Sequence, residues 1–293
     1  AYDAGEAMQE PMDDPEEIDW NTEEYNVVAE NPFVAVADQP LSTFSADVDT
    51  ASYANLRRML CSGYALDQIP SGAVRTEEMV NYFRYDYQTP AAGEPFGVTA
   101  QISHCPWNNN TMLLVLGLAT QDLDYENAPA SNLVFLLDVS GSMESEDKLP
   151  LLQDAFSYLV EQLGADDTVS IVTYAGEERV VLDGANGNED RDILKAIRNL
   201  MANGSTDGQS GLEMAYRLAE KNYIAGGNNR IIMASDGDLN VGMTSTSDLF
   251  DYVSEKRETG IYLSVLGFGE GNYKDNKMET LADNGNGNYY YID

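Results

Sequence analysis

The chain has 293 residues, 43% of them hydrophobic, which is enough for one large domain with a core and a smaller domain beside it. Its 16 basic and 50 acidic residues give a formal net charge of −34, which repels nucleic-acid phosphates and anionic lipid surfaces, so nucleic acid is not an expected partner. No apolar run is long enough to span a bilayer, and the first residue is not Met, so we expect any export signal to be removed or to lie outside the sequence.

Residues 1–30 are rich in acids and contain no Lys or Arg. A segment of this kind repels itself and has little apolar surface to bury, so the pattern predicts an extended, solvated acidic tether. The alternative, an acidic segment that docks on a basic partner, is supported by the charge alone.

Residues 31–127 have a different pattern, typical of a small mixed α+β domain. Alternation over residues 41–48 predicts a strand, and Asp49 is expected to cap a helix over residues 52–60. A second helix is predicted from Thr76. Strands over residues 96–103 and 112–118 flank a Pro- and Asn-rich connection, which indicates an antiparallel hairpin.

From residue 128 to residue 293, strands alternate regularly with helices. The predicted strands cover residues 133–137, 168–174, 179–182, 230–235, 261–267 and 289–292, and the predicted helices cover residues 148–163, 193–201, 211–222, 249–259 and 278–283. Residues 183–190 are expected to form a plain loop, since their acids do not follow the spacing of an EF-hand. Alternation of this kind predicts a doubly wound, mainly parallel α/β sheet with right-handed crossovers.

The chemistry-bearing stretch of this domain is Asp138-Val139-Ser140-Gly141-Ser142, which follows the apolar run of residues 133–137. The run is typical of a strand buried on both faces, and the stretch therefore lies at the carboxyl end of a strand. Ligands of open α/β sheets bind at this edge. A carboxylate and two hydroxyls are hard oxygen donors, so we expect Mg²⁺ first, with Ca²⁺ or Mn²⁺ as alternatives.

At these residues the sequence resembles the von Willebrand factor type A domains, whose metal-ion-dependent adhesion site uses Asp-x-Ser-x-Ser, a Thr and a further Asp. The matching positions follow in the family's order: Asp138, Ser140, Ser142, Thr206 and Asp236. The resemblance implies that a carboxylate of a protein ligand completes the coordination of the ion. From the chemistry alone, a catalytic water could take that position equally well.

Residues 31–127 resemble the companion region that precedes the type A domain in bacterial exported proteins. The stretches that carry this resemblance lie at residues 44–55, 74–83 and 105–107. The resemblance implies an extracellular, cell-surface or periplasmic protein, compatible with a lipid or other anchor upstream of residue 1. The family ends this domain with one more helix, which is absent here, so the last flank of the sheet is expected to be open or covered by another segment.

The two cysteines, Cys61 and Cys105, are either a bridge or two buried thiols on sequence grounds. The acidic tether and the implied export favour oxidation, so we predict a disulfide between them.

These observations favour a metal-dependent protein-binding module without catalytic activity, whose partner presents an exposed acidic residue. A Ser-His-Asp hydrolase needs a histidine near the serines, and the single one, His104, lies in the other region. A metal-assisted hydrolase would need a phosphate cradle or basic clamp, which the motif lacks. An assembly or scaffold protein with a structural metal loop remains the alternative.

Overall fold

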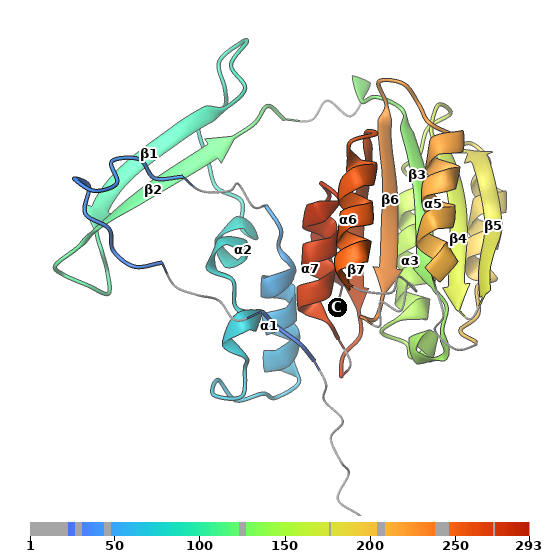
Figure 1. The fold of residues 1–293 in the computed structure, drawn as a ribbon, viewed down its shortest axis with the longest axis horizontal. Coiled ribbons are helices and arrows are strands. Elements are labelled where there is room, and N and C mark those ends of the chain that lie inside the picture. The colour runs from blue at the N-terminus through green and yellow to red at the C-terminus, as the bar shows by residue number, and fades with distance from the viewer. Residues whose placement is uncertain are drawn as a thin grey trace, which may run out of the picture.

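The computed structural model describes residues 23–26, 31–43, 48–122, 127–175, 177–203, 209–237, 246–271 and 273–292. Its larger part is a six-stranded sheet covered by helices, and a two-stranded hairpin projects to one side (Figure 1). This arrangement confirms the predicted fold class, an α/β sheet preceded by a small mixed segment with antiparallel strands.

The large sheet has the strand order β5-β4-β3-β6-β7-β8. Only the β4–β5 pair is antiparallel. The strands are β3 (Ser131–Asp138), β4 (Thr168–Ala175), β5 (Glu177–Asn186), β6 (Asn228–Ser235), β7 (Ile261–Phe268) and β8 (Tyr289–Ile292). The helices between them are α3 (Leu149–Val160), α4 (Asp190–Arg198), α5 (Gln209–Lys221), α6 (Thr246–Arg257) and α7 (Asp275–Asn284).

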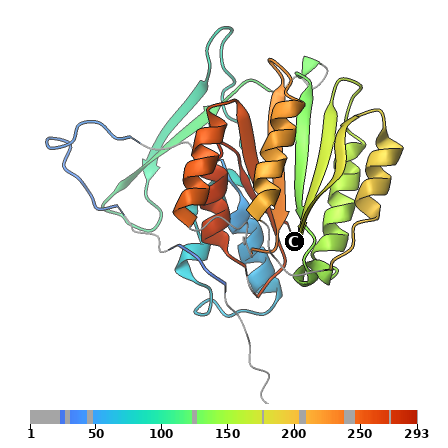
Figure 2. The same ribbon diagram turned by 45° about the vertical axis from the view of Figure 1, so that its right-hand side comes forward.

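Strand β3 is buried on both faces, as its apolar run predicts. Val134 and Leu136 belong to the cluster under α5, α6 and α7, whereas Phe135 and Leu137 belong to the cluster under α3 and α4. The two helix layers are visible on opposite faces of the sheet in Figure 2. Because both faces are covered by helices, the buried carboxylates that end β3 and follow β6 lie at the carboxyl edge of the sheet.

Two sequence predictions are wrong at the level of local structure. Residues 41–43 and 48 are not in a strand, and residues 44–47 lie outside the described part. Residues 183–186, expected in a loop, complete β5, because this strand pairs with β4 as far as the Thr168–Asn186 pair. The length of β5 follows from this pairing, which a window of local sequence does not contain.

Helix α1 (Ala51–Cys61) packs on the sheet of the large domain, beside β8 and α7. Ala51 and Ala54 belong to the same hydrophobic cluster as Tyr289 and Tyr291. Helix α2 (Thr76–Asn81) follows after the short turn η1 (Ser71–Ala73). The helical part of residues 31–127 therefore shares the core of the large domain and covers one face of its last strand.

Asp49 does not cap α1, contrary to the prediction. The N-cap residue is Thr50, and it makes no side-chain capping bond. The buried carboxylate of Asp49 instead accepts hydrogen bonds from the backbone N–H of Tyr289 at 3.0 Å and from Asn288 Nδ2 at 3.1 Å. These bonds fasten the start of α1 to the start of β8, a partner more than 230 positions away in sequence.

Residues 23–26 depart from the predicted tether, because they bind the folded body. The backbone N–H of Glu24 donates to the Tyr273 carbonyl at 2.9 Å, and the Lys274 ammonium binds the Glu24 carboxylate at 2.8 Å. Glu23 is paired with Arg58 of α1 at 3.0 Å. The carboxylates of this short stretch thus attach it to the folded body through ion pairs. Residues 1–22 and 27–30 lie outside the described part.

The predicted disulfide is contradicted, because both cysteines are free. Cys61 is the exposed last residue of α1, and Cys105 is buried directly after β1 (Gly97–His104). Helix α1 packs on the large sheet, whereas β1 pairs with β2 (Met112–Ala119), so the two thiols belong to different layers.

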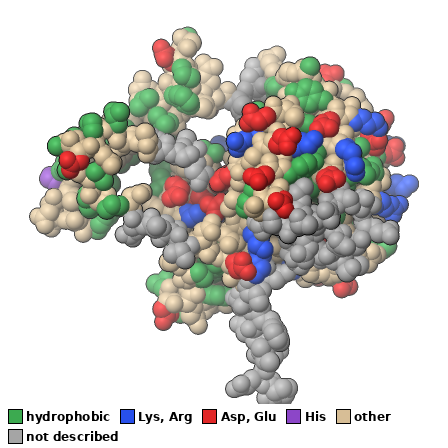
Figure 3. Space-filling view, viewed as in Figure 1, with side chains coloured by type: hydrophobic (Ala, Val, Ile, Leu, Met, Phe, Trp, Pro, Cys, Tyr) green, Lys and Arg blue, Asp and Glu red, His purple; other side chains and the backbone are tan. Residues whose placement is uncertain are grey.

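The β1–β2 hairpin has one face made almost entirely of apolar side chains. Ile102 and Leu114 face each other on it, and they are 69% and 57% exposed. Residues 95–121 contain no Asp, Glu, Lys or Arg. In the space-filling view, the hairpin carries mainly hydrophobic and uncharged surface, whereas the helices of the large sheet carry many charges (Figure 3).

The face of the sheet opposite α1 is less well covered over β6, β7 and β8. A groove of about 380 Å³ runs there between Phe156 and Leu159 of α3 and Leu266 and Tyr290 of the sheet. Helix α1 covers the other face of the sheet there. Within the described part of the chain, no helix combines the length and apolarity needed to cross a membrane.

The buried Arg75 cluster generates a stability prediction. Its guanidinium binds the carboxylates of Glu78 and Asp275, both buried. Arg75→Met leaves two buried carboxylates without their cation, so the free energy of unfolding in urea should fall by about 3–5 kcal/mol. Lys221→Met removes an exposed pair with Asp183 and should cost less than about 1 kcal/mol. Similar small losses in both variants would contradict a structural role for the cluster.

Glu279, next to this cluster, generates a prediction of pH dependence. Burial raises the pKa of Glu279 to about 7; Arg75 opposes the shift, and the charge of Asp275 adds to it. Because the folded-state pKa is raised above 4.5, the native state loses stability as pH rises from about 4.5 to 7. Glu279→Gln should therefore be more stable than wild type at pH 8, by about 2 kcal/mol, and not at pH 4. Urea titrations at both pH values, with exposed Glu161→Gln as the control, test this; a difference independent of pH would reject it.

Candidate metal site

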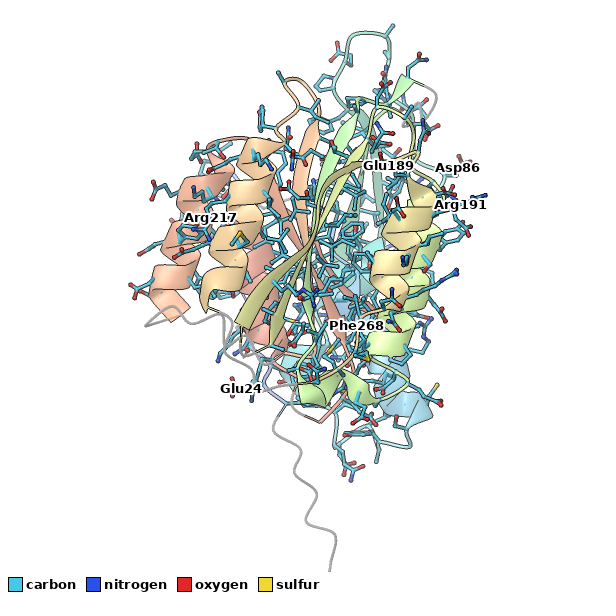
Figure 4. The ribbon with its side chains drawn as sticks, turned by 90° about the vertical axis from the view of Figure 1, so that its right-hand side faces the viewer. Glu24, Asp86, Glu189, Arg191, Arg217 and Phe268 are labelled. Atoms are coloured by element: carbon cyan, nitrogen blue, oxygen red, sulfur yellow. The ribbon has the colours of Figure 1, made fainter. Side chains whose placement is uncertain are left out.

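The candidate site lies at the carboxyl edge of the parallel strands. Strand β3 ends at Asp138 and β6 ends at Ser235, and the two strands pair in parallel up to Leu137 and Ala234. Asp138 and Asp236 therefore leave neighbouring strands at the same edge. Phe268 marks the carboxyl end of β7 at this edge, and Glu24 lies at the same end of the sheet (Figure 4).

Asp138 is fully buried and held by two internal donors. The backbone N–H of Ser140 donates to Oδ1 at 2.9 Å, and the Ser235 hydroxyl donates to Oδ2 at 3.3 Å. Burial raises the pKa of Asp138 to about 6; the bonds from Ser140 oppose this shift, and the nearby charge of Asp236 adds to it. At neutral pH the carboxylate is thus ionised but poorly solvated, and a bound cation would relieve its unfavourable environment.

Ser140 and Ser142 bring their hydroxyls together beside Asp138. Their Oγ atoms lie 2.9 Å apart, and Ser140 is buried whereas Ser142 is exposed. The short helix η3 (Gly141–Glu144) makes this turn, and the backbone N–H of Met143 donates to the Ser140 carbonyl at 3.0 Å. The alternate serines of the motif therefore converge, as the sequence predicts.

Asp236 has one carboxylate oxygen without a partner. Oδ2 accepts a hydrogen bond from the Lys148 ammonium at 3.0 Å, whereas the buried Oδ1 has no partner among the described residues. The next residue, Gly237, has φ +106°, and a Cβ there would come within 2.6 Å of the Lys274 backbone nitrogen. Glycine is required after the aspartate because the loop that begins α7 approaches so closely.

Thr206, the fifth predicted ligand, falls within residues 204–208, which lie outside the described part. Its loop starts at the site, because the Asn203 backbone N–H donates to the Val139 carbonyl at 2.9 Å. The structure therefore brings Asp138, Ser140, Ser142 and Asp236 together and leaves the position of Thr206 undescribed.

Three residues of the site were not predicted from the sequence. Lys148 and Ser235 bind the two carboxylates, and the buried hydroxyl of Tyr174 at the end of β4 lies close enough for the charge of Asp138, after burial itself, to raise its pKa. The position of Ser235, directly before the predicted ligand Asp236, was an available signal. Lys148 offers no such signal in the sequence, because the side chain of a lysine before a helix is ordinarily solvated.

The donor set fits a hard divalent cation. In the described part of the chain, no group of three or more Asp, Glu, His or Cys residues could hold a metal, so hydroxyl oxygens must accompany the two carboxylates. Asp138, Ser140, Ser142 and Asp236 would hold the ion, and the unpartnered Oδ1 of Asp236 is a ready ligand. Oxygen donors of this kind suit Mg²⁺ or Ca²⁺ better than softer metals. The bound ion would supply a Lewis-acidic position for an incoming oxygen.

A groove opens next to the metal-binding edge. It has a volume of about 580 Å³ and runs from Val139 and Asn203 across β4 and β5 to the end of α4. Arg179 and Lys195 contribute positive charge to its lining, and Asp192 contributes a negative charge. The groove and the site share Val139, so a ligand at the site could extend over basic side chains.

Family models match both parts of the chain. The model described as von Willebrand factor type A domain matches residues 132–293, and a second model, described as von Willebrand factor, matches residues 19–115. The uncharacterized Escherichia coli protein YfbK is 45% identical over 279 residues, which cover 93% of this chain and 48% of YfbK.

More distant similarities follow the same pattern. The uncharacterized protein sll0103 of Synechocystis is 26% identical over 183 residues, covering 61% of this chain and 42% of sll0103. The chain thus spans about half the length, or less, of these curated relatives. Among solved structures, the conserved hypothetical protein BatB from Bacteroides thetaiotaomicron is similar, with a TM-score of 0.48 and 19% identity over 56% of this chain and 91% of BatB.

The carboxylate pair predicts stabilisation by a divalent ion. Because Mg²⁺ would bind the native site and not the unfolded chain, the melting temperature should rise and saturate, with about 2.7 kcal/mol of stabilisation at a hundredfold excess over Kd. Asp138→Ala should abolish the rise, whereas Asp154→Ala on the exposed side of α3 should keep it. Differential scanning calorimetry in Mg²⁺ and in EDTA measures the effect, and identical wild-type curves in both would reject the site.

Proposed function

Since residues 132–293 match its family model, the chain belongs to the von Willebrand factor type A domain family, and we propose that it is a metal-dependent protein-binding module. The observation that carries the proposal is the convergence of two buried carboxylates and two hydroxyls at one sheet edge, where Oδ1 of Asp236 has no partner among the residues that the structure describes. Type A domains mediate protein interaction and adhesion, which agrees with a site at an accessible edge.

The proposed ligand is a protein that presents an exposed Glu or Asp. Hydroxyl donors neutralise no charge on the ion, so a bound divalent cation keeps affinity for a further anionic oxygen. The net charge of −34 repels an acidic partner at long range, but charges beyond a Debye length of about 8 Å are mostly screened. Arg179 and Lys195 in the adjacent groove add a local attraction.

The geometry does not favour a Ser-His-Asp hydrolase. His104, the single histidine of the chain, is the last residue of β1 in the hairpin, whereas the serines lie at the edge of the large sheet. Ser140 Oγ is within hydrogen-bonding distance of Ser142 Oγ, and in the described part of the chain no histidine lies beside either hydroxyl to activate it in the manner of a triad.

The proposed location is the cell surface or the periplasm. Support comes from the resemblance of residues 31–127 to the companion region of exported type A proteins. Fractionation with an antibody against this chain tests the location directly.

The acidic-ligand proposal predicts how binding responds to salt and chelator. Envelope proteins captured on the immobilised chain in Mg²⁺ should be released by EDTA, and Asp138→Ala should capture none of them. Added salt should speed association, because it damps the long-range repulsion between two acidic proteins. Surface plasmon resonance with the captured partner measures both effects. If binding survives EDTA, or if salt slows association, the recognition surface lies elsewhere and the scaffold alternative gains.

A further inference from the structure

Lys148 places a buried ammonium group inside the candidate metal site. Its side chain is 11% exposed, and Nζ donates to Asp236 Oδ2 and to the Ser142 carbonyl, both at 3.0 Å. The Lys148 ammonium thus connects the loop that follows β3 with the loop that follows β6. A buried lysine is costly unless it is paired, so this position needs an explanation beyond helix formation.

The absence of a side chain at Gly269 leaves room for the Lys148 side chain. Gly269, at the end of β7, has φ +74°, and a Cβ at this position would overlap Cε of Lys148. The Tyr291 hydroxyl donates to the Gly269 carbonyl at 2.8 Å, which holds the glycine in place. At the other end, the Lys148 backbone is held by bonds to Ser145 and Leu152. The lysine is therefore oriented toward Asp236 by the surrounding backbone.

The charge balance of the site depends on this lysine. Among the described residues of the site, two ionised carboxylates and one ammonium leave a single net negative charge, and a bound divalent cation converts it into a single net positive charge. Without the lysine, the same ion would be neutralised completely by Asp138 and Asp236. The ammonium therefore weakens the attraction of the site for the ion and strengthens the attraction of the loaded site for an anionic ligand.

We propose that Lys148 is a positioning residue and a counter-cation of the metal site. Its ammonium binds one carboxylate oxygen of Asp236, and its positive charge leaves the ion-loaded site with a net positive charge that attracts an acidic ligand. This inference rests on the proposed metal-dependent function. It adds a determinant of ligand class that the Asp-x-Ser-x-Ser pattern does not contain. A purely structural link between residues 142 and 236 is the competing explanation.

The decisive experiment is calorimetric titration of Mg²⁺ alone into wild type, Lys148→Met and Lys148→Gln at pH 7.5. Both variants remove the positive charge, and the amide of the Gln variant keeps a hydrogen-bond donor. The proposal predicts that both bind Mg²⁺ about tenfold more tightly than wild type, because a repulsive charge is lost. It also predicts lower melting temperatures for both in EDTA, with recovery in Mg²⁺. Lys256→Met, which removes a partly buried lysine of α6 that pairs with Glu220 of α5, is the matched control and should keep the wild-type Kd.

Each outcome has a distinct meaning. If the wild type binds Mg²⁺ and both lysine variants bind it with the same or a higher Kd, the counter-cation role is overturned and the proposed function stays intact. A Gln variant that matches wild type while the Met variant binds more weakly would assign Lys148 a structural role through its hydrogen bonds. Absence of Mg²⁺ binding by wild type would reject the proposed function, and this inference with it.

Discussion

The desolvated pair Asp138 and Asp236 is the electrostatic constraint on which the rest of the site depends. Both side chains are buried because they end neighbouring strands whose faces are covered by helices. Two like charges in such a place destabilise the fold unless donors or cations surround them. Asp138 accepts hydrogen bonds from the Ser235 hydroxyl and the Ser140 backbone N–H, and Asp236 accepts one from the Lys148 ammonium. Each bond stabilises the charge of one carboxylate. Oδ1 of Asp236 keeps no partner in the described part of the chain, and a divalent ion would bind it.

The loop between β7 and α7 connects the site with the N-terminal segment. On one side, Gly269 forms the wall against which the buried lysine of the site packs. On the other side, the Gly271 backbone N–H donates to the Glu23 carboxylate at 3.0 Å, and Arg58 of α1 pairs with Glu270 at 3.2 Å. Glu23 and helix α1 thus support the loop that shapes the metal site, which gives the N-terminal part of the chain a physical role in the type A domain.

The two halves of the companion segment differ in how they bury apolar surface. Helix α1 inserts Ala51 and Ala54 into the main core and is fastened by the Arg75 cluster and by Asp49. The hairpin instead presents Ile102 and Leu114 to solvent. A two-stranded hairpin is marginally stable alone, so its position depends on neighbouring chain. Part of that support comes from Gln88, whose backbone N–H donates to Thr99 Oγ1 at 2.9 Å in β1.

The sequence by itself determined the alternation of strands and helices, the buried strand at residues 133–137 and four of the residues that converge at the sheet edge, because periodicity and motif spacing are local properties of the chain. Only the tertiary structure decided the roles of Asp49, Lys148 and residues 23–26. Their partners lie 88 to 250 positions away, at Asp236, Tyr289 and Lys274. It also left Cys61 and Cys105 as free thiols, the first at the end of α1 and the second after β1, which a count of cysteines could not show. Burial and charge pairing between residues far apart in sequence determine these roles, and a local window of the sequence does not include both partners.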